Sequence, residues 1–193
     1  MVFGEMSRAR NGEGLSMPLD IFKEWHEFYL LVGTAAATLI ALLFVAASIG
    51  AGIMAPERAS ATRIYMSPVI FHFSSILLVS LAVLVPSYPR QTHGLLIGLN
   101  AIVGAVASSA ICARVLMHSG GDSGVDWIDR LAYGAAPLIA YAGALAAAIL
   151  IFLNVNFGPD VLAAALVLLL IANIRNAWDI TLVMARRRSG NSP

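Results

Sequence analysis

The sequence predicts an all-α membrane protein, a polytopic transmembrane helical bundle with five transmembrane helices. Of its 193 residues, 59% are hydrophobic and 12% are charged, and the mean hydropathy is +0.82. Soluble domains carry about 25% charged residues, so this composition is typical of a membrane protein. Five apolar stretches are each long enough to cross a bilayer, which takes roughly 20 residues. They cover residues 27–50, 66–86, 94–117, 131–153 and 161–185.

The two ends of the chain lie outside this single domain, which we place at residues 18–185. Residues 1–17 are rich in Gly, Ser, Arg and Glu and are expected to form a flexible tail; they lack the apolar core of a cleaved secretory signal. Residues 186–193 form a basic C-terminal tail. The net charge of +1 argues against nucleic acid as a partner, and the single cysteine, Cys112, excludes an intrachain disulfide.

The first predicted helix follows Pro18 and carries an aromatic group of the kind found at membrane interfaces, namely Trp25, Phe28 and Tyr29. Small residues then recur every four positions, at Gly33, Ala37 and Ala41. This spacing lets two helix backbones approach closely, so we expect tight packing along it.

The next two predicted helices carry isolated polar residues. A loop with Pro56, Glu57, Arg58 and Arg63 precedes the second helix, which contains His72 and ends before Pro86. On the third helix, small and weakly polar residues share one stripe at a spacing of four: Asn100, Gly104, Ser108 and Cys112. We expect this stripe to face another helix.

A polar loop, residues 119–130, leads to a fourth predicted helix that is rich in Ala and contains Pro137 and Tyr141. A turn with Gly158 and Pro159 leads to the fifth helix, which three arginines end. At about 100° per residue, the polar residues of the fifth helix fall on one arc of roughly 160°, with Ile174 and Trp178 pointing away. These residues are Asn173, Arg175, Asn176 and Asp179. Ionisable groups within a bilayer usually face a bundle interior, so this face is the first candidate site.

Positive residues predict the orientation of the bundle. With a cytoplasmic C-terminus, seven Lys and Arg residues of loops and tails lie inside and four lie outside. The positive-inside rule therefore favours an external N-terminus and a cytoplasmic C-terminus. In this orientation, counting about 1.5 Å per residue places His72 and Asp179 at a similar depth, with Ser109, Cys112 and Tyr133 near that level.

The sequence thus predicts a polar layer in the inner half of the bundle, formed by His72, Asn100, Ser109, Asn173, Arg175, Asn176 and Asp179. Arg175 and Asp179 are four residues apart on one helix and can form an ion pair. Two interpretations stay open: a structural pair that orders helix packing, or a gate or proton-linked pair. His72 is expected to be a neutral histidine hydrogen-bonded to a neighbouring helix, or a group that titrates near neutral pH.

Enzymatic chemistry finds little support in the sequence. The chain has no G-x-S-x-G, P-loop or H-E-x-x-H motif and no Cys pair, and only one carboxylate lies well inside a predicted helix. We therefore expect no catalytic residues, no metal and no cofactor, and we disfavour bis-histidine haem because the four histidines lie near opposite edges of the membrane. A lipid-acting enzyme with His72 as base is the remaining enzymatic alternative.

Three stretches carry a resemblance to a known family: Phe28 to Ala46, residues 67–86 with Ser67-Pro68, His72-Phe73 and Pro86, and the tetrad Asn176-Ala177-Trp178-Asp179. Together they resemble an uncharacterised family of small bacterial five-span integral membrane proteins. The tetrad in the last helix is the most specific part, and Ala41 stands where such sequences have Gly. Some similar proteins are labelled modulators of a membrane-bound AAA protease, but the family has no established activity, so the resemblance indicates which residues matter without implying a reaction.

We therefore expect a small non-enzymatic protein of the bacterial inner membrane, crossing it several times, with a channel-like or transport-like activity at the polar layer. A homo-oligomer is expected, because five helices leave little room for a pore and the small-residue stripes offer subunit contacts. The alternative is a regulatory or assembly partner of a larger membrane complex. The expected partners are thus the lipid bilayer, further copies of the chain or another membrane protein.

Overall fold

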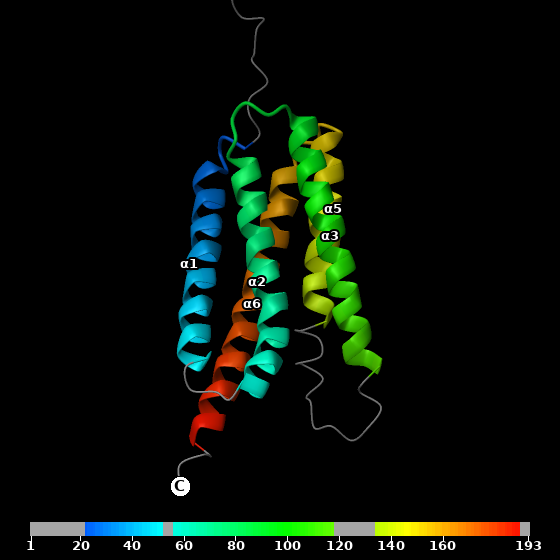
Figure 1. Ribbon diagram of the computed structural model, residues 1–193. Helices are drawn as coiled ribbons and strands as arrows, with labels where there is room; N and C mark the ends of the chain where they lie inside the picture. Colours follow the sequence, from blue (N-terminus) through cyan, green and yellow to red (C-terminus); the bar gives the residue numbers. More distant parts are fainter. Residues whose placement is uncertain (1–21, 52–55, 118–133, 190–193) are drawn as a thin grey trace, which may run out of the picture.

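The computed structural model describes residues 22–51, 56–117 and 134–189, and in these ranges every regular element is a helix. Five helices follow one another along the chain (Figure 1): α1 (His26–Ala51), α2 (Pro56–Val83), α3 (Arg90–Met117), α5 (Ala136–Phe152) and α6 (Gly158–Ser189). The predicted all-α fold is confirmed.

The observed helices differ from the predicted apolar stretches mainly where a helix continues into polar sequence. α1 and α3 begin and end within a few residues of the stretches 27–50 and 94–117. α2 begins at Pro56, ten residues before the apolar stretch, because a helix can continue into a polar sequence where no breaker intervenes. For the same reason α6 continues through the three arginines to Ser189, and therefore through the first part of the expected basic tail. Residues 1–17 lie outside the described residues.

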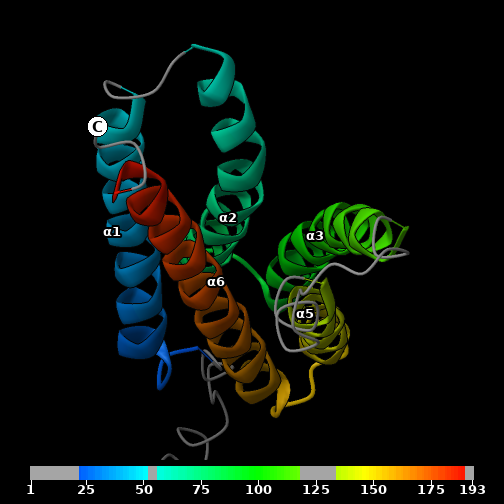
Figure 2. The same cartoon turned by 90° about the horizontal axis from the view of Figure 1, so that it is seen from below.

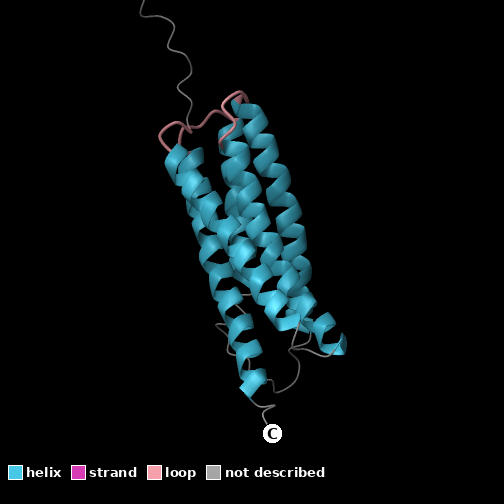
Figure 3. Ribbon diagram, turned by 60° about the vertical axis from the view of Figure 1, so that its left-hand side comes forward, coloured by secondary structure: helices cyan, strands magenta, loops and turns pink. Residues whose placement is uncertain are grey.

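Two helix pairs and one joining helix make up the bundle. α1 packs along α2, and α3 packs along α5; α6 packs against α5 and, less extensively, against α2 and α1. Seen along the bundle axis in Figure 2, α6 runs diagonally between the two pairs. Figure 3 shows the helices running side by side along one common direction. Direct contact between α2 and α3 is limited, so the two pairs are joined chiefly through α6.

Small residues set the close contact between α3 and α5. A Cβ at Gly94 would lie 3.0 Å from the carbonyl oxygen of Ala148, and a Cβ at Gly104 would overlap the ring of Tyr141. Four alanines of α5 are buried: Ala140, Ala144, Ala147 and Ala148. Small side chains let helix backbones approach, as expected for the stripe that contains Asn100 and Gly104.

The outer surface of the bundle is apolar. Large hydrophobic side chains are exposed on every helix, among them Leu31 on α1, Leu78 on α2, Leu95 on α3, Ile139 on α5 and Ile171 on α6. Soluble proteins rarely expose apolar patches of this extent. Within the described residues, three stretches are long and apolar enough to cross a membrane: His26–Ile49, Arg90–Ala110 and Gly158–Asp179. Two shorter apolar helices, Ser67–Val83 and Ala136–Phe152, accompany them. These features indicate a membrane protein.

The end of the bundle where α1 begins is held by aromatic residues and a tight turn. The Tyr29 hydroxyl is buried and donates a 2.8 Å hydrogen bond to the backbone oxygen of Pro159, which joins the first turns of α1 and α6. Asn154 adopts a left-handed backbone conformation, with φ 62°, in the turn between α5 and α6. Asn tolerates this conformation better than most residues, so the turn can be short.

Candidate functional site

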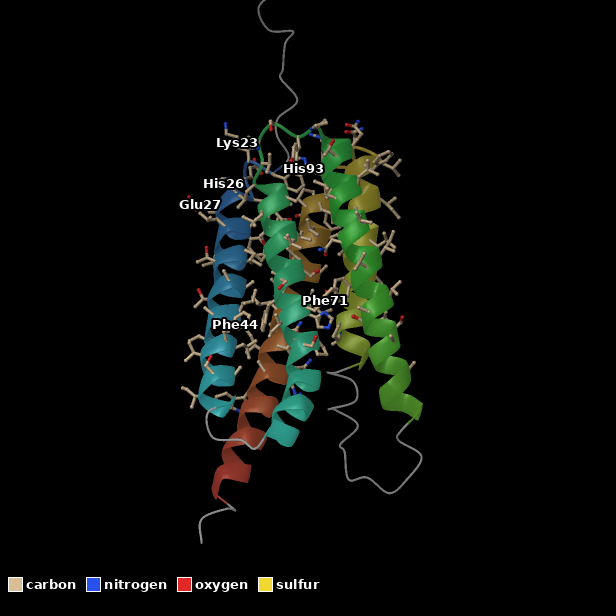
Figure 4. All side chains as sticks on the ribbon, viewed as in Figure 1. Lys23, His26, Glu27, Phe44, Phe71 and His93 are labelled. Atoms are coloured by element: carbon tan, nitrogen blue, oxygen red, sulfur yellow. The ribbon has the colours of Figure 1, made fainter. Side chains whose placement is uncertain are left out.

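The clearest polar site within the bundle is a hydrogen-bonded cluster that joins three helices. It consists of His72 and Ser75 on α2, Asn100 on α3 and Tyr141 on α5. We call these four residues the interhelix cluster. His72, Ser75 and Tyr141 are buried, and Asn100 is half-buried. Figure 4 labels Phe71, the neighbour of His72, about halfway along the bundle. The cluster therefore lies at a level where side chains are otherwise mostly apolar.

The contact between His72 and Tyr141 is the centre of the interhelix cluster. The Nδ1 atom of His72 lies 2.9 Å from the hydroxyl oxygen of Tyr141, and the two rings are tilted with their centroids 5.6 Å apart. His72 is 3% exposed and Tyr141 is 1% exposed. A buried imidazole needs a hydrogen-bond partner, and the Tyr hydroxyl provides one from a neighbouring helix. The sequence-based expectation of a histidine bonded to a neighbouring helix agrees with this contact.

Ser75 extends the cluster to α3. Its hydroxyl donates a 2.5 Å hydrogen bond to Oδ1 of Asn100 and is also a hydrogen-bond partner of the Tyr141 hydroxyl. Because a Ser hydroxyl carries one proton, donation to Asn100 leaves Ser75 as the acceptor from Tyr141. In that case the Tyr141 oxygen accepts from His72 and Nδ1 carries the proton, although the role of this ring nitrogen depends on the tautomer. The cluster is therefore a series of polar contacts from His72 through Tyr141 and Ser75 to Asn100.

Backbone geometry on α3 makes room for the central tyrosine. Asn100 and Gly104 are one helical turn apart on the face of α3 that packs against α5, and the ring of Tyr141 lies against Gly104. Any larger residue at position 104 would occupy the space of the ring. Gly104 thus positions the Tyr141 hydroxyl between His72 and Ser75 without contacting either polar group itself.

The structure divides the predicted polar face of α6. Asn173 and Asn176 are buried, Asp179 is half-buried, and Arg175 is exposed together with Trp178. The buried side of α6 follows Leu162, Leu166 and Leu169 to Asn173 and Asn176. At about 100° per residue, the centre of that stripe lies about 140° from Arg175 and about 100° from Asp179. The two amides therefore face the bundle, whereas the charged residues lie at its edge or outside.

The remaining predicted site residues do not join the interhelix cluster. Ser109 is exposed, and its hydroxyl donates to the backbone oxygen of Val106 at 2.8 Å on its own helix. The side chain of Cys112, and Tyr133, lie outside the described residues. Of the predicted set, His72 and Asn100 belong to the cluster, and Asn173 and Asn176 are buried elsewhere on α6.

The expected common level of His72 and Asp179 differs from the observed one. His72 lies eleven residues before the end of α2 at Val83, whereas Asp179 lies twenty-one residues after the start of α6 at Gly158. These two helix ends lie at the same end of the bundle in Figure 1. At about 1.5 Å per residue, the two levels differ by about 15 Å. The reason is the early start of α2, which places His72 near the middle of its helix.

Buried side-chain atoms with no hydrogen-bond partner among the described residues include Oγ of Ser108 and Oδ1 of Asn173. The Nδ2 atom of Asn173 donates to the backbone oxygen of Leu169 at 2.8 Å, so only its carbonyl side is left over. Buried polar atoms of this kind are often satisfied by internal water. In the described part of the chain, no group of three or more His, Cys, Asp or Glu residues is placed to hold a metal ion.

Sequence reasoning missed two members of the interhelix cluster, Ser75 and Tyr141. One signal was present: Ser75 follows His72 by three residues, which places both on one face of a helix. Tyr141 is a single polar group in an Ala-rich stretch, and only the folded structure shows that its hydroxyl meets His72 of α2.

Fold and site together define an all-helical membrane-type bundle with a buried hydrogen-bonded cluster. Comparison with protein-family models, with curated proteins and with solved structures gave no match. The functional interpretation therefore relies on the chemistry of the residues described above.

Proposed function

We propose that the chain is a non-enzymatic, multi-pass inner-membrane protein that moves protons, or a small solute together with protons, through the bundle at the interhelix cluster. The observation that supports this most directly is the series of polar contacts from His72 through Tyr141 and Ser75 to Asn100, which links three helices. Polar groups of this kind are costly inside an apolar bundle and commonly mark ion or proton pathways.

The chemistry of the four side chains suits proton transfer. Imidazole has two ring nitrogens that can each bind or donate a proton, and Tyr and Ser hydroxyls both donate and accept hydrogen bonds. If His72 takes up a proton at Nε2 and releases the one at Nδ1 to Tyr141, Tyr141 passes its own hydroxyl proton to Ser75, and Ser75 releases its proton to a water molecule. Asn100 orients the Ser75 hydroxyl, because an amide oxygen accepts a hydrogen bond but does not hold a proton. Rotation of the two hydroxyls and return of His72 to the tautomer protonated at Nδ1 restore the starting state. The unsatisfied atoms of Ser108 and Asn173 offer sites where water would extend the path beyond the cluster.

The arrangement in the membrane forms part of the proposal. All five helices cross the bilayer, with the N-terminus outside and the C-terminus cytoplasmic, as the distribution of Lys and Arg favours. The chain acts as a homo-oligomer, because the exposed faces of its helices are apolar and five helices enclose little space.

Flux measurements in liposomes test this proposal. Purified protein is reconstituted in vesicles that contain a pH-sensitive dye, and a proton gradient is imposed with a potassium diffusion potential to balance charge. We expect the wild-type protein to accelerate the dye response. His72→Gln and Tyr141→Phe should each reduce the rate of this response about tenfold. Ser109→Ala is the matched control, because Ser109 is an exposed hydroxyl outside the cluster. Wild-type vesicles without proton or solute flux, or full flux in both cluster variants, would contradict the proposal.

A second candidate function is supported by the outward face of α6. Arg175 is exposed next to Ile171, Ile174 and Trp178, which are 61%, 44% and 63% exposed. Charged residues in membrane segments usually face protein or water rather than lipid. This face therefore supports the alternative of a regulatory or assembly partner of a larger membrane complex, for example a membrane protease.

Affinity purification from native membranes separates the two candidates. A stoichiometric partner that is lost in Trp178→Ala, while Leu31→Ala on the exposed face of α1 retains it, would favour the regulatory role. Recovery of only the chain itself, as one defined oligomer, would favour transport.

A further inference from the structure

Two cavities adjoin along the seam between α1 and α2. The larger has a volume of about 520 Å³ and lies between the start of α1 and the end of α2. The smaller, about 200 Å³, lies further along the same seam toward the middle of the helices. Leu84 lines both, so the two cavities form one continuous groove. We call it the α1–α2 groove.

The larger cavity carries charges of both signs. Lys23 and His26 line it together with Glu24 and Glu27. Lys23, His26 and Glu27 are labelled in Figure 4 and lie at the same end of α1. The membrane-length stretch of α1 begins at His26, so these side chains stand at the level where lipid headgroups meet the protein. The cavity therefore offers a cation and two carboxylates at headgroup depth.

The smaller cavity is an apolar slot with one hidden hydroxyl. Leu30 and Ala37 of α1 and Leu77 and Leu81 of α2 are among its walls. Ser80 also lines it, is 1% exposed, and its Oγ has no hydrogen-bond partner among the described residues. That hydroxyl faces α1: a Cβ added at Gly33 would lie 3.4 Å from it.

We propose that the α1–α2 groove binds one phospholipid with a phosphoethanolamine headgroup. The phosphate lies against Lys23 and His26, the primary ammonium lies against the carboxylates of Glu24 and Glu27, and one acyl chain fills the apolar slot. Ser80 donates its free hydrogen bond to an ester carbonyl of the lipid just below the headgroup. The inference is independent of the proposed transport activity.

The balance of charges selects this headgroup. A purely anionic headgroup has no cation, so the two carboxylates of the cavity would repel it without a compensating attraction. A quaternary choline has no N–H to donate, whereas a primary ammonium forms charge-assisted hydrogen bonds with both carboxylates. Continuity with the slot below selects a membrane lipid over a free phosphate compound, because burial of each methylene contributes about 0.8 kcal/mol.

Binding experiments on the delipidated full chain in detergent test the groove. Lipids with identical acyl chains and phosphoethanolamine, phosphocholine or phosphoglycerol headgroups are titrated, with one-to-one adducts followed by native mass spectrometry. We expect the phosphoethanolamine lipid to bind about tenfold more tightly than the other two, a difference of about 1.4 kcal/mol. Equal binding of the three lipids, or tighter binding of either competitor, would overturn the proposal.

Variants then test the two halves of the groove separately. Lys23→Gln and Glu27→Gln are expected to abolish the headgroup preference, and Leu81→Trp to fill the slot and weaken binding about tenfold. Leu78→Trp is the matched control on α2: Leu78 is 59% exposed and Leu81 53%, but Leu78 is not part of the slot. Similar losses in both Trp variants, or glycerophosphoethanolamine binding as tightly as the intact lipid, would show that the slot holds no acyl chain.

Discussion

Polar residues occur in two regions of this bundle, and the two differ in how they meet. In the interhelix cluster, residues from α2, α3 and α5 that are far apart in the sequence form one hydrogen-bonded chain. On α6, four polar residues that are close in the sequence separate between the buried side and the exposed side. The polar residues of α6 were therefore easier to recognise in the sequence, because they lie close together in it. The interhelix cluster is the better-connected site, because packing between helices brings its residues into contact. The comparison predicts that changes at the cluster cost more stability than changes on α6.

The largest effect is expected at Gly104. In Gly104→Ala the added methyl group overlaps the buried ring of Tyr141, which hydrogen bonds to His72 and Ser75 hold in place. Overpacking of this kind costs about 3 kcal/mol. Denaturant unfolding in a mild detergent measures the loss. Gly98→Ala is the control, because its Cβ would make an ordinary 3.5 Å contact with the Cβ of Ala148. Equal losses at the two positions would show that Tyr141 is free to move aside.

An intermediate effect is expected from Tyr141→Phe. This variant keeps the ring but leaves His72 and Ser75 without their shared partner, which costs about 1 to 3 kcal/mol for buried polar groups. Tyr88→Phe is the control, since Tyr88 is 42% exposed and should change the free energy of unfolding by less than about 0.5 kcal/mol. An unchanged stability of Tyr141→Phe would mean that the hydroxyl contributes nothing net to the cluster.

The smallest effects are expected on α6, where burial should decide the order. Asn173→Ala removes a fully buried side chain that is bonded to the oxygen of Leu169, and we expect a loss of about 1 kcal/mol. Trp178→Ala removes a larger but 63% exposed side chain and should cost less than about 0.5 kcal/mol in detergent. If Trp178→Ala is the more damaging change, the exposed face of α6 carries a contact with a second copy or another protein.

Hydropathy and helix periodicity were sufficient to predict the fold class. Long apolar stretches separated by breakers leave few alternatives to a helical bundle, and the small-residue stripe on α3 correctly indicated a close helix contact at Gly104. The start of α2 was not predictable in this way, because a helix that continues beyond the apolar stretch has no hydropathy signal. That shift of ten residues is what displaced His72 from the level of Asp179.

The candidate site was only partly accessible from sequence. His72 and Asn100 stood out as polar groups within apolar stretches, and both belong to the cluster. Their partners Ser75 and Tyr141 did not stand out in the sequence. Whether a residue of α2 meets one of α5 depends on how α6 places the pair α1–α2 against the pair α3–α5. On α6 a polar arc of roughly 160° is wider than the strip that one neighbouring helix covers. Periodicity alone therefore could not decide that Asn173 and Asn176 face inward while Arg175 does not.

The joining position of α6 has a consequence for how the protein is made. The pairs α1–α2 and α3–α5 are both complete before the ribosome reaches residue 158, yet the contacts that hold one pair to the other come mainly from α6. The arrangement of one pair against the other is therefore fixed mainly once the last helix has been made. The buried amides Asn173 and Asn176 belong to this last helix, so their burial also depends on its packing between the two pairs.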